Sequence, residues 1–269
     1  MTTTTFTPGR IGQPVAFGGV LRSEWIKLLS LRSTYWSLAA AFVLSVGVST
    51  LAAFAIGGLA QPEGAELTIP VGQIGATGLF LTQLVFGVLG AIAITGEYST
   101  GMIRSTFTAV PTRTPALLAK SLVLFVVAFV VGLVTLVVST AAGALVFSAL
   151  GQSLSFDEFG AEIALPLLGG ALYLGLLTVF ALAVGAMVRA GAGAIAIVLG
   201  ILLVIPSVLA AIPVEWVQEG GRYMLSTAGM GLSNALAIDA DFWRNLIVTV
   251  AWPVVALLGA IGVVLKRDA

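Results

Sequence analysis

The sequence contains no cysteine and no histidine among its 269 residues. Disulfide bonds are therefore excluded, and the usual ligands of structural zinc, haem and iron–sulfur centres are missing. A Walker A loop needs Gly-Lys followed by Ser or Thr. Lys120 precedes a serine, but Thr114 and Ala119 stand where the glycines are required. We therefore expect no catalysis, no metal site and no cofactor in this chain.

Charged residues are also scarce, at 9% of the sequence, whereas hydrophobic residues make up 59%. A soluble domain carries about 25% charged residues and could not keep so many apolar side chains off its surface. The formal net charge of +0 argues against a nucleic-acid partner, because phosphate binding needs a basic excess. The composition therefore predicts an integral membrane protein.

Long uncharged segments locate the membrane spans, because a charge at the bilayer centre costs roughly 2.5–3.5 kcal/mol on insertion scales. The apolar runs do not alternate with polar residues as the strands of a β-barrel would. An all-α fold with six transmembrane helices is predicted, in a single domain over residues 15–269. The predicted spans are residues 34–59, 75–96, 117–150, 163–188, 191–212 and 245–265.

The basic residues are distributed unevenly between alternate loops. Of the 12 basic residues, all but Arg222 and Arg244 lie in the termini or in the loops on the same side of the membrane as the termini. Of the 12 acidic residues, all but three lie in the loops on the opposite side. Lys and Arg concentrate in cytoplasmic loops of membrane proteins. Both termini are therefore predicted to be cytoplasmic, and residues 1–14, rich in Thr, Gly and Pro, are predicted to form a disordered tail.

Two cytoplasmic segments carry unusual sequences. Before the first span, apolar residues including Trp25 recur at helical spacing beside polar ones including Lys27, and Arg32 follows. This pattern predicts an amphipathic helix at the membrane interface, with a soluble cap packed on the bundle as the alternative. Residues 97–115 join spans two and three, and Gly101 can take a positive φ that ends the second span's extension. Residues 103–109 are long enough for two helical turns, so the segment either docks a partner or serves packing alone.

Two features outside the cytoplasmic loops also stand out. Residues 213–244 are too interrupted to span the membrane but too apolar for a free loop, which predicts a partly re-entrant external segment. Trp216 and Tyr223 in it are candidate gate residues or ordinary interface anchors. Within span two, Gln83 should face protein or a water-filled path, since its amide needs hydrogen bonds. An interhelical hydrogen bond and, together with Thr82, a contact in a translocation path are the alternatives.

The six-span order, the helix before the first span and the segment Gly96-Glu97-Tyr98-Ser99-Thr100-Gly101-Met102-Ile103-Arg104 resemble the actinobacterial branch of the ABC-2 type permeases. The resemblance covers nearly the whole chain. It implies a bacterial plasma-membrane permease subunit that works with two copies of a separate ABC ATPase subunit and with a second six-span subunit, identical or homologous. ATP and Mg would bind to the ATPase subunit. It assigns the coupling to the ATPase to Glu97, Tyr98, Ser99, Thr100, Gly101, Ile103 and Arg104.

The resemblance also implies export of a hydrophobic or amphiphilic compound, as in drug and antibiotic resistance. A membrane-embedded sensor or scaffold that binds a partner without moving a solute is the alternative. An ion-gradient-driven carrier is disfavoured, because such carriers usually bury a carboxylate or a base in a span, and the six long uncharged segments contain neither.

Overall fold

The computed structural model describes residues 16–59, 68–110, 112–155 and 159–266, so the predicted tail at residues 1–14 lies outside the described residues. Its elements are α1 (Phe17–Ser30), α2 (Arg32–Phe54), η1 (Ala55–Leu59), β1 (Thr68–Pro70), α3 (Val71–Ser99), α4 (Met102–Ala109), α5 (Thr114–Ala149), β2 (Ser153–Ser155), η2 (Phe159–Ala164), α6 (Leu165–Val188), α7 (Gly191–Leu199), η3 (Gly200–Val204), α8 (Ile205–Ala211), α9 (Glu215–Gly221), α10 (Leu225–Ser233) and α11 (Ala240–Lys266).

Six helices are long and apolar enough to cross a membrane, which confirms the predicted all-helical architecture. They cover Arg32–Gly58, Val71–Ser99, Thr114–Ala149, Gly160–Val188, Gly191–Ala211 and Ala240–Lys266. Several extend beyond the predicted limits. The charge-free windows end where the first ionised residue appears, whereas a helix continues as long as its backbone hydrogen bonds are made.

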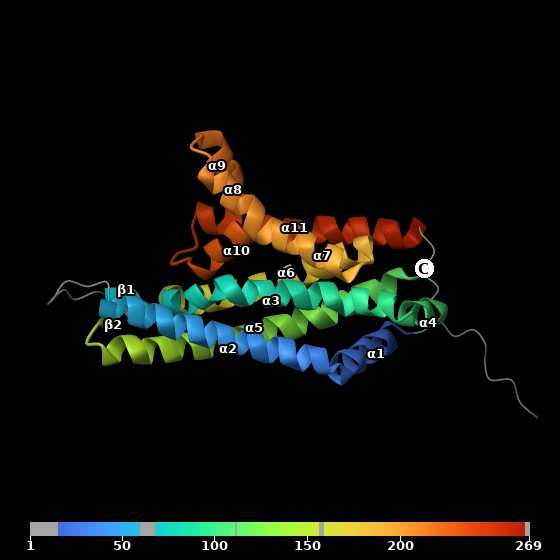
Figure 1. Ribbon diagram of the computed structural model, residues 1–269, viewed down its shortest axis with the longest axis horizontal. Helices are drawn as coiled ribbons and strands as arrows, with labels where there is room; N and C mark the ends of the chain where they lie inside the picture. Colours follow the sequence, from blue (N-terminus) through green and yellow to red (C-terminus); the bar gives the residue numbers. More distant parts are fainter. Residues whose placement is uncertain (1–15, 60–67, 111, 156–158, 267–269) are drawn as a thin grey trace, which may run out of the picture.

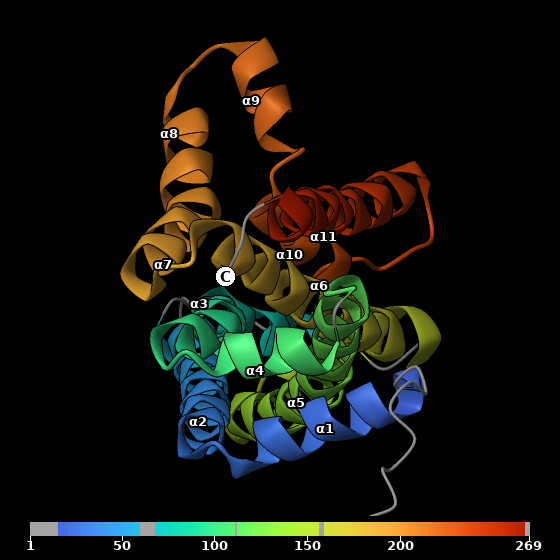
Figure 2. The same cartoon turned by 90° about the vertical axis from the view of Figure 1, so that its right-hand side faces the viewer.

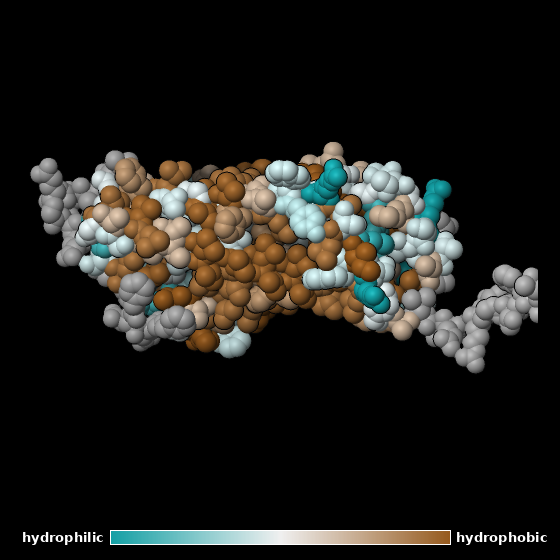
Figure 3. Space-filling view, turned by 90° about the horizontal axis from the view of Figure 1, so that it is seen from below, coloured by the Kyte–Doolittle hydropathy of each residue, from teal (hydrophilic) through white to brown (hydrophobic). Residues whose placement is uncertain are grey.

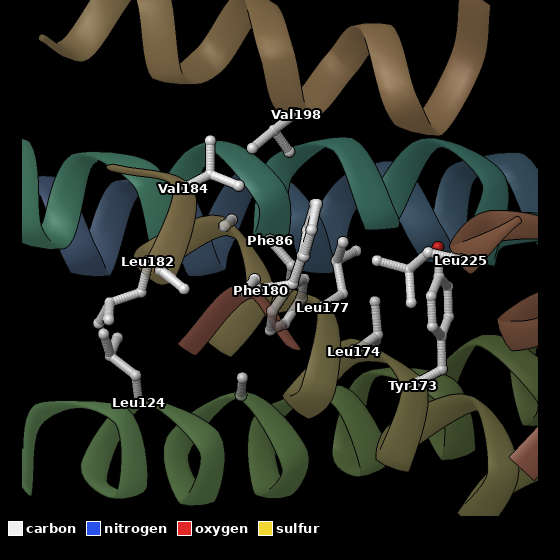
Figure 4. Close-up of a cluster of buried hydrophobic side chains, with 14 of the residues drawn as sticks. Phe86, Leu124, Tyr173, Leu174, Leu177, Phe180, Leu182, Val184, Val198 and Leu225 are labelled. Atoms are coloured by element: carbon white, nitrogen blue, oxygen red, sulfur yellow. The ribbon is translucent and has the colours of Figure 1, made fainter. Parts of the chain in front are cut away.

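The bundle is organised around α6. The most apolar window of this span is 78% buried, the highest share of the six, and α3, α5 and α11 pack around it (Figures 1 and 2). Figure 4 shows its side chains Leu174, Leu177 and Phe180 pointing between the neighbouring helices, near Phe86 of α3. α2 covers α3 and α5 on the other side. Because other helices surround α6, this span contacts protein along most of its length and has little surface facing lipid.

A glycine allows α3 and α6 to approach closely. A Cβ atom on Gly90 would lie 2.3 Å from the carbonyl oxygen of Thr178 and 2.9 Å from the Cβ of Ala181. Small residues at such crossings let two helix backbones pack together within the membrane, where van der Waals contact is a main source of association. The α3–α6 contact therefore depends on the missing side chain at position 90.

The fifth span leaves the bundle partway along its length. Its helical winding changes from α7 through the π-helical turn η3 to α8, which begins with Ile205 and Pro206, and the most apolar window of this span is only 17% buried. α8 and α9 stand away from the other helices, and the chain then returns through α10, which packs against α6 and α11 (Figures 1 and 2). The predicted re-entrant segment thus folds back onto the protein through α10.

Two short strands are the sole non-helical regular elements in the described ranges. β1 pairs in parallel with β2, with Thr68 opposite Ser153 and Pro70 opposite Ser155. They lie at the end of the bundle opposite α1 and α4 (Figure 1). Between the two ends, the face formed by α2 and α5 carries a broad apolar surface, with hydrophilic residues gathered toward α1 (Figure 3). This band is what a lipid-facing surface requires.

Candidate functional site

The helix α4 lies across one end of the bundle, beside α1 (Figure 2). We call this end the α4 end. α3 ends at Ser99, and Gly101 follows with a φ of 72°, in the left-handed region, which confirms the predicted turn. Ile103 is buried against the bundle, whereas Arg104, Ser105 and Thr108 are exposed. The helix therefore has one anchored face and one polar face that is open to a partner.

Four charged side chains form a buried network beneath α4. Lys120 Nζ lies 2.8 Å from Glu97 Oε1 and 2.5 Å from Glu24 Oε2, and Lys27 Nζ lies 2.7 Å from Glu24 Oε1 and 3.4 Å from Glu97 Oε1. Lys27 also donates a hydrogen bond to Thr106 Oγ1 at 3.0 Å. We call these four charged residues the charge cluster. It joins α1, the end of α3, the start of α5 and, through Thr106, α4.

The charge cluster is balanced and largely shielded from water. Glu24 and Glu97 are 3% and 4% exposed, so each carboxylate depends on its lysine partners for compensation. Burial lowers the pKa of Lys27, but its hydrogen bond to Glu24 and the charge of Glu97 raise it more, so the net pKa lies above its ordinary value of 10.5. Lys27 is therefore charged throughout the physiological pH range, and its contribution to stability would be lost only as the pH rises above that value.

α1 places charge on the side that faces the protein. Val20, Glu24 and Leu28 are buried at helical spacing, whereas Trp25 and Leu29 are exposed. The helix thus packs on the bundle, as the cap alternative requires, and also presents apolar side chains outward, as an interfacial helix requires. Both alternatives describe part of its structure.

Further contacts tie the remaining helices to the α4 end. The guanidinium of Arg113 donates a hydrogen bond to the carbonyl oxygen of Val264 at 3.0 Å, near the end of α11. A cation at a helix C-terminus also complements the helix dipole. Arg189, after α6, lies over the ring of Tyr98 at 5.2 Å from its centroid. Basic residues from several inter-span segments therefore meet at one end of the molecule.

The start of the coupling segment belongs to the cytoplasmic extension of the second span that was predicted to end at Gly101. α3 continues through Glu97, Tyr98 and Ser99, and Thr100 caps it with a hydroxyl hydrogen bond to the carbonyl of Gly96. Glu97 ends the uncharged stretch of the sequence, but the helix continues past it. Arg32 is the first residue of α2 and is exposed.

Two members of the charge cluster, Glu24 and Lys120, were absent from the sequence prediction. Each has a signal that could have found it. Glu24 falls four residues after Val20 and four before Leu28, on a face that is otherwise apolar. Lys120 follows Pro115 by little more than one helical turn, in a segment that is apolar from Pro115 to Val131 except for Lys120 and Ser121. A charge at a core-facing position requires a partner of opposite charge, and the predicted topology places Glu24 and Lys120 at the same end of the bundle.

Within the bundle, Gln83 is completely buried and its side-chain oxygen accepts a hydrogen bond from the hydroxyl of Tyr173 on α6. The expected interhelical hydrogen bond is thus present. Thr82 is equally buried, and its hydroxyl donates to the carbonyl of Gly78 within α3 at 2.8 Å. The two neighbours therefore differ, since one engages another helix and the other its own.

The two candidate gate residues lie on the segment that follows α8. Trp216 on α9 is 76% exposed, and Tyr223 just after α9 is 54% exposed. The carbonyl of Tyr223 accepts a hydrogen bond from the indole of Trp252 on α11 at 3.0 Å. This contact fixes the backbone at Tyr223 to the sixth span while leaving both aromatic side chains outside the core.

The six long apolar helices and the apolar band define a multi-pass membrane protein. A sequence model described as ABC-2 family transporter protein matches residues 20–207, from α1 to the start of α8. This is well over half of the 269 residues, and the chain belongs to that family. It is the membrane permease component of an ABC-2 type transporter, a family that binds no cofactor itself and works with an ABC ATPase. No curated protein matches the chain.

Proposed function

We propose that the chain forms the translocation path of an ATP-driven exporter for hydrophobic or amphiphilic compounds, and that α4 is the docking helix for the ATPase. The observation that carries the proposal is the charge cluster beneath α4, because it links the exposed helix to two membrane spans and to α1. A partner that moves α4 would act on Thr106 and Ile103, and through them on α1, α3 and α5. Glu97 then serves as the internal link of this coupling segment, and Arg104 as its contact with the partner.

The proposed assembly follows from the family. Two ATPase subunits, which bind ATP and Mg, would sit beneath two six-span permease subunits in a bacterial plasma membrane, with the α4 end and both termini in the cytoplasm. Trp25, Lys27 and Arg32 would hold α1 at the membrane surface. Export of an antibiotic or drug would make the complex a resistance determinant.

The path and the gate are proposed on the predicted residues. Gln83 is the better candidate of the pair in span two, because the hydroxyl of Thr82 is already bonded within its own helix. Trp216 and Tyr223 would act at the external mouth, where α8 and α9 stand away from the bundle. Movement of this arm would open or close the route between α3 and the fifth span.

Reversing the charge at Arg104 should weaken ATPase docking. We expect Arg104→Glu to reduce the ATPase that copurifies with the tagged chain in mild detergent by about 10-fold, which corresponds to roughly 1.4 kcal/mol. The ATPase is identified in the purified complex by its Walker A sequence. Arg222→Glu changes another exposed arginine, after α9, and is the matched control that should leave the yield unchanged. Equal recovery with both variants would remove α4 as the docking surface.

The absence of cysteine makes the orientation directly measurable. A single cysteine at exposed Ser105 should react with a membrane-impermeant maleimide only after the cells are opened, whereas one at exposed Glu219 should react in intact cells. The reason is the excess of basic residues at the α4 end, which favours the cytoplasmic side. Labelling of Ser105→Cys in intact cells would invert the proposed topology.

A further inference from the structure

A cleft opens between α3, the η3 and α8 part of the fifth span, and α10. Its volume is about 210 Å³, and its apolar walls include Phe80 and Leu202. Ligand pockets for whole drug-sized molecules are typically about 300–1,000 Å³. The cleft is therefore suited to one end of a larger amphiphile, with the remainder lying outside it.

The irregular winding of the fifth span creates this cleft. Below it, α7 lies against α3, where Val198 is fully buried and a Cβ on Gly87 would lie 3.0 Å from it. The π-helical turn η3 and Pro206 then redirect the chain, and α8 has no buried residue. Proline lacks the amide needed to continue a regular helix, and π-helical turns are frequent at functional sites. The separation of α8 from α3 is thus built into the sequence.

Gln83 forms part of the cleft wall and keeps an unused hydrogen-bonding group. Its side-chain oxygen is held by the Tyr173 hydroxyl, which fixes the orientation of the amide. Its Nε2 is buried, and among the described residues it has no hydrogen-bond acceptor. A buried amide nitrogen without an acceptor costs about 1–3 kcal/mol, so an acceptor that reaches it is favoured.

The other polar groups of the cleft are also uncharged. Ser226 and Thr227 lie in the first turn of α10, where the backbone amides have no partner within the helix and favour acceptor oxygens. Ser207 contributes a hydroxyl from α8, although it is donated to the carbonyl of Leu203. No charged side chain is found among the described residues that line the cleft. The wall thus offers donors to a neutral ligand.

The geometry points to a binding site for the uncharged, hydrogen-bond-accepting end of an amphiphile, such as an ester or amide carbonyl, with Gln83 Nε2 as the buried donor. This inference rests on the proposed function, since it names the substrate class of the proposed path. Both a transported solute and a membrane lipid carry such carbonyl groups, and the test separates these two sources.

Binding is measured on the purified complex without nucleotide, in nanodiscs of ether-linked phosphatidylcholine, whose lipids carry no ester carbonyl. The probes are a fluorescent long-chain fatty acid methyl ester and an alkane analogue that lacks the ester. We expect the ester probe to bind more tightly than the alkane. Gln83→Met, which is similar in volume, should weaken the ester probe by about 10-fold and leave the alkane unchanged. Gln73→Met, on the same helix but outside the cleft, is the control.

Equal binding of the ester by wild type and Gln83→Met, or equal binding of the two probes by wild type, would overturn the inference. If Gln83→Met does not yield monodisperse protein, Tyr173→Phe replaces it, and loss of the hydroxyl that orients the amide should weaken only the ester probe. Repeating the measurement in ester-linked phosphatidylcholine separates the sources. Weaker probe binding there assigns the cleft to lipid carbonyls, and unchanged binding assigns it to a solute. Because no ATP is present, failure of ATP-driven export would leave these results intact, and failure here would leave the docking role of α4 intact.

Discussion

Lys120→Met should give the largest loss of stability of any single substitution at the α4 end. Lys120 contacts both Glu97 and Glu24, at 2.8 and 2.5 Å, and its removal leaves two buried carboxylates with Lys27 alone. Breaking a buried ion pair by removing one partner costs about 3–5 kcal/mol, because the remaining charge is uncompensated. The fraction of protein that stays monodisperse in detergent after heating measures the effect.

The matched control for this substitution is Lys266→Met, which removes an exposed lysine at the same end of the molecule. A second comparison isolates the electrostatic cause. Glu24→Gln combined with Lys120→Met restores one negative and one positive charge in the cluster, so the double variant should recover a large part of the stability lost by the single one. If Lys120→Met were as stable as Lys266→Met, the charge cluster would have no structural role.

Gly90→Leu should prevent normal packing of the central helix. The first atom of any side chain at this position would fall 2.3 Å from a backbone oxygen of α6, and a backbone cannot move aside as a flexible side chain can. Overpacking typically costs about 1–3 kcal/mol and occasionally more, and a direct clash with backbone belongs at the upper end. We expect a low yield of monodisperse protein and a lower temperature of aggregation in detergent.

The control for Gly90→Leu lies on the same helix. Gly96→Leu places an identical side chain where nothing lies within 4 Å of the new Cβ, so it should leave the yield and the aggregation temperature close to those of wild type. Both substitutions gain the same helix propensity relative to glycine. Similar destabilisation by the two would mean that helix packing at position 90 is not the cause.

The sequence predicted the spans well because the cost of burying charge in lipid is large and local. It also predicted the left-handed turn at Gly101 and the short helix after it, since both depend on neighbouring residues. The charge cluster was only partly predictable, for a different reason. Glu24 and Lys120 each stand among apolar residues, which indicates that each needs a partner, but they are far apart along the chain and no sequence pattern pairs them. Only the packing of α1 on α5 brings them together.

Gln83 illustrates the same limit within the membrane. A glutamine in a span predicts a hydrogen-bonding partner, but the sequence does not say which of several hydroxyls provides it. Tyr173 does so because α6 is central and Gly229 leaves room for its ring under α10, where a Cβ would lie 2.0 Å from the aromatic carbons. Pro206 alters the helix locally, whereas the cleft beside it requires α3, the fifth span and α10 at once.

The two short strands acquire significance when the ends of α3 and α5 are considered together. β1 leads directly into α3 and β2 follows α5, so backbone hydrogen bonds fasten these helices at one end, while Glu97 and Lys120 fasten them at the other. Two helices that are joined at both ends tilt together as one rigid unit, and neither slides far along the other. We expect rearrangement of the subunit to fall on the arm of α8 and α9, which stands away from the bundle and is joined to α11 by the hydrogen bond between Trp252 and the carbonyl of Tyr223.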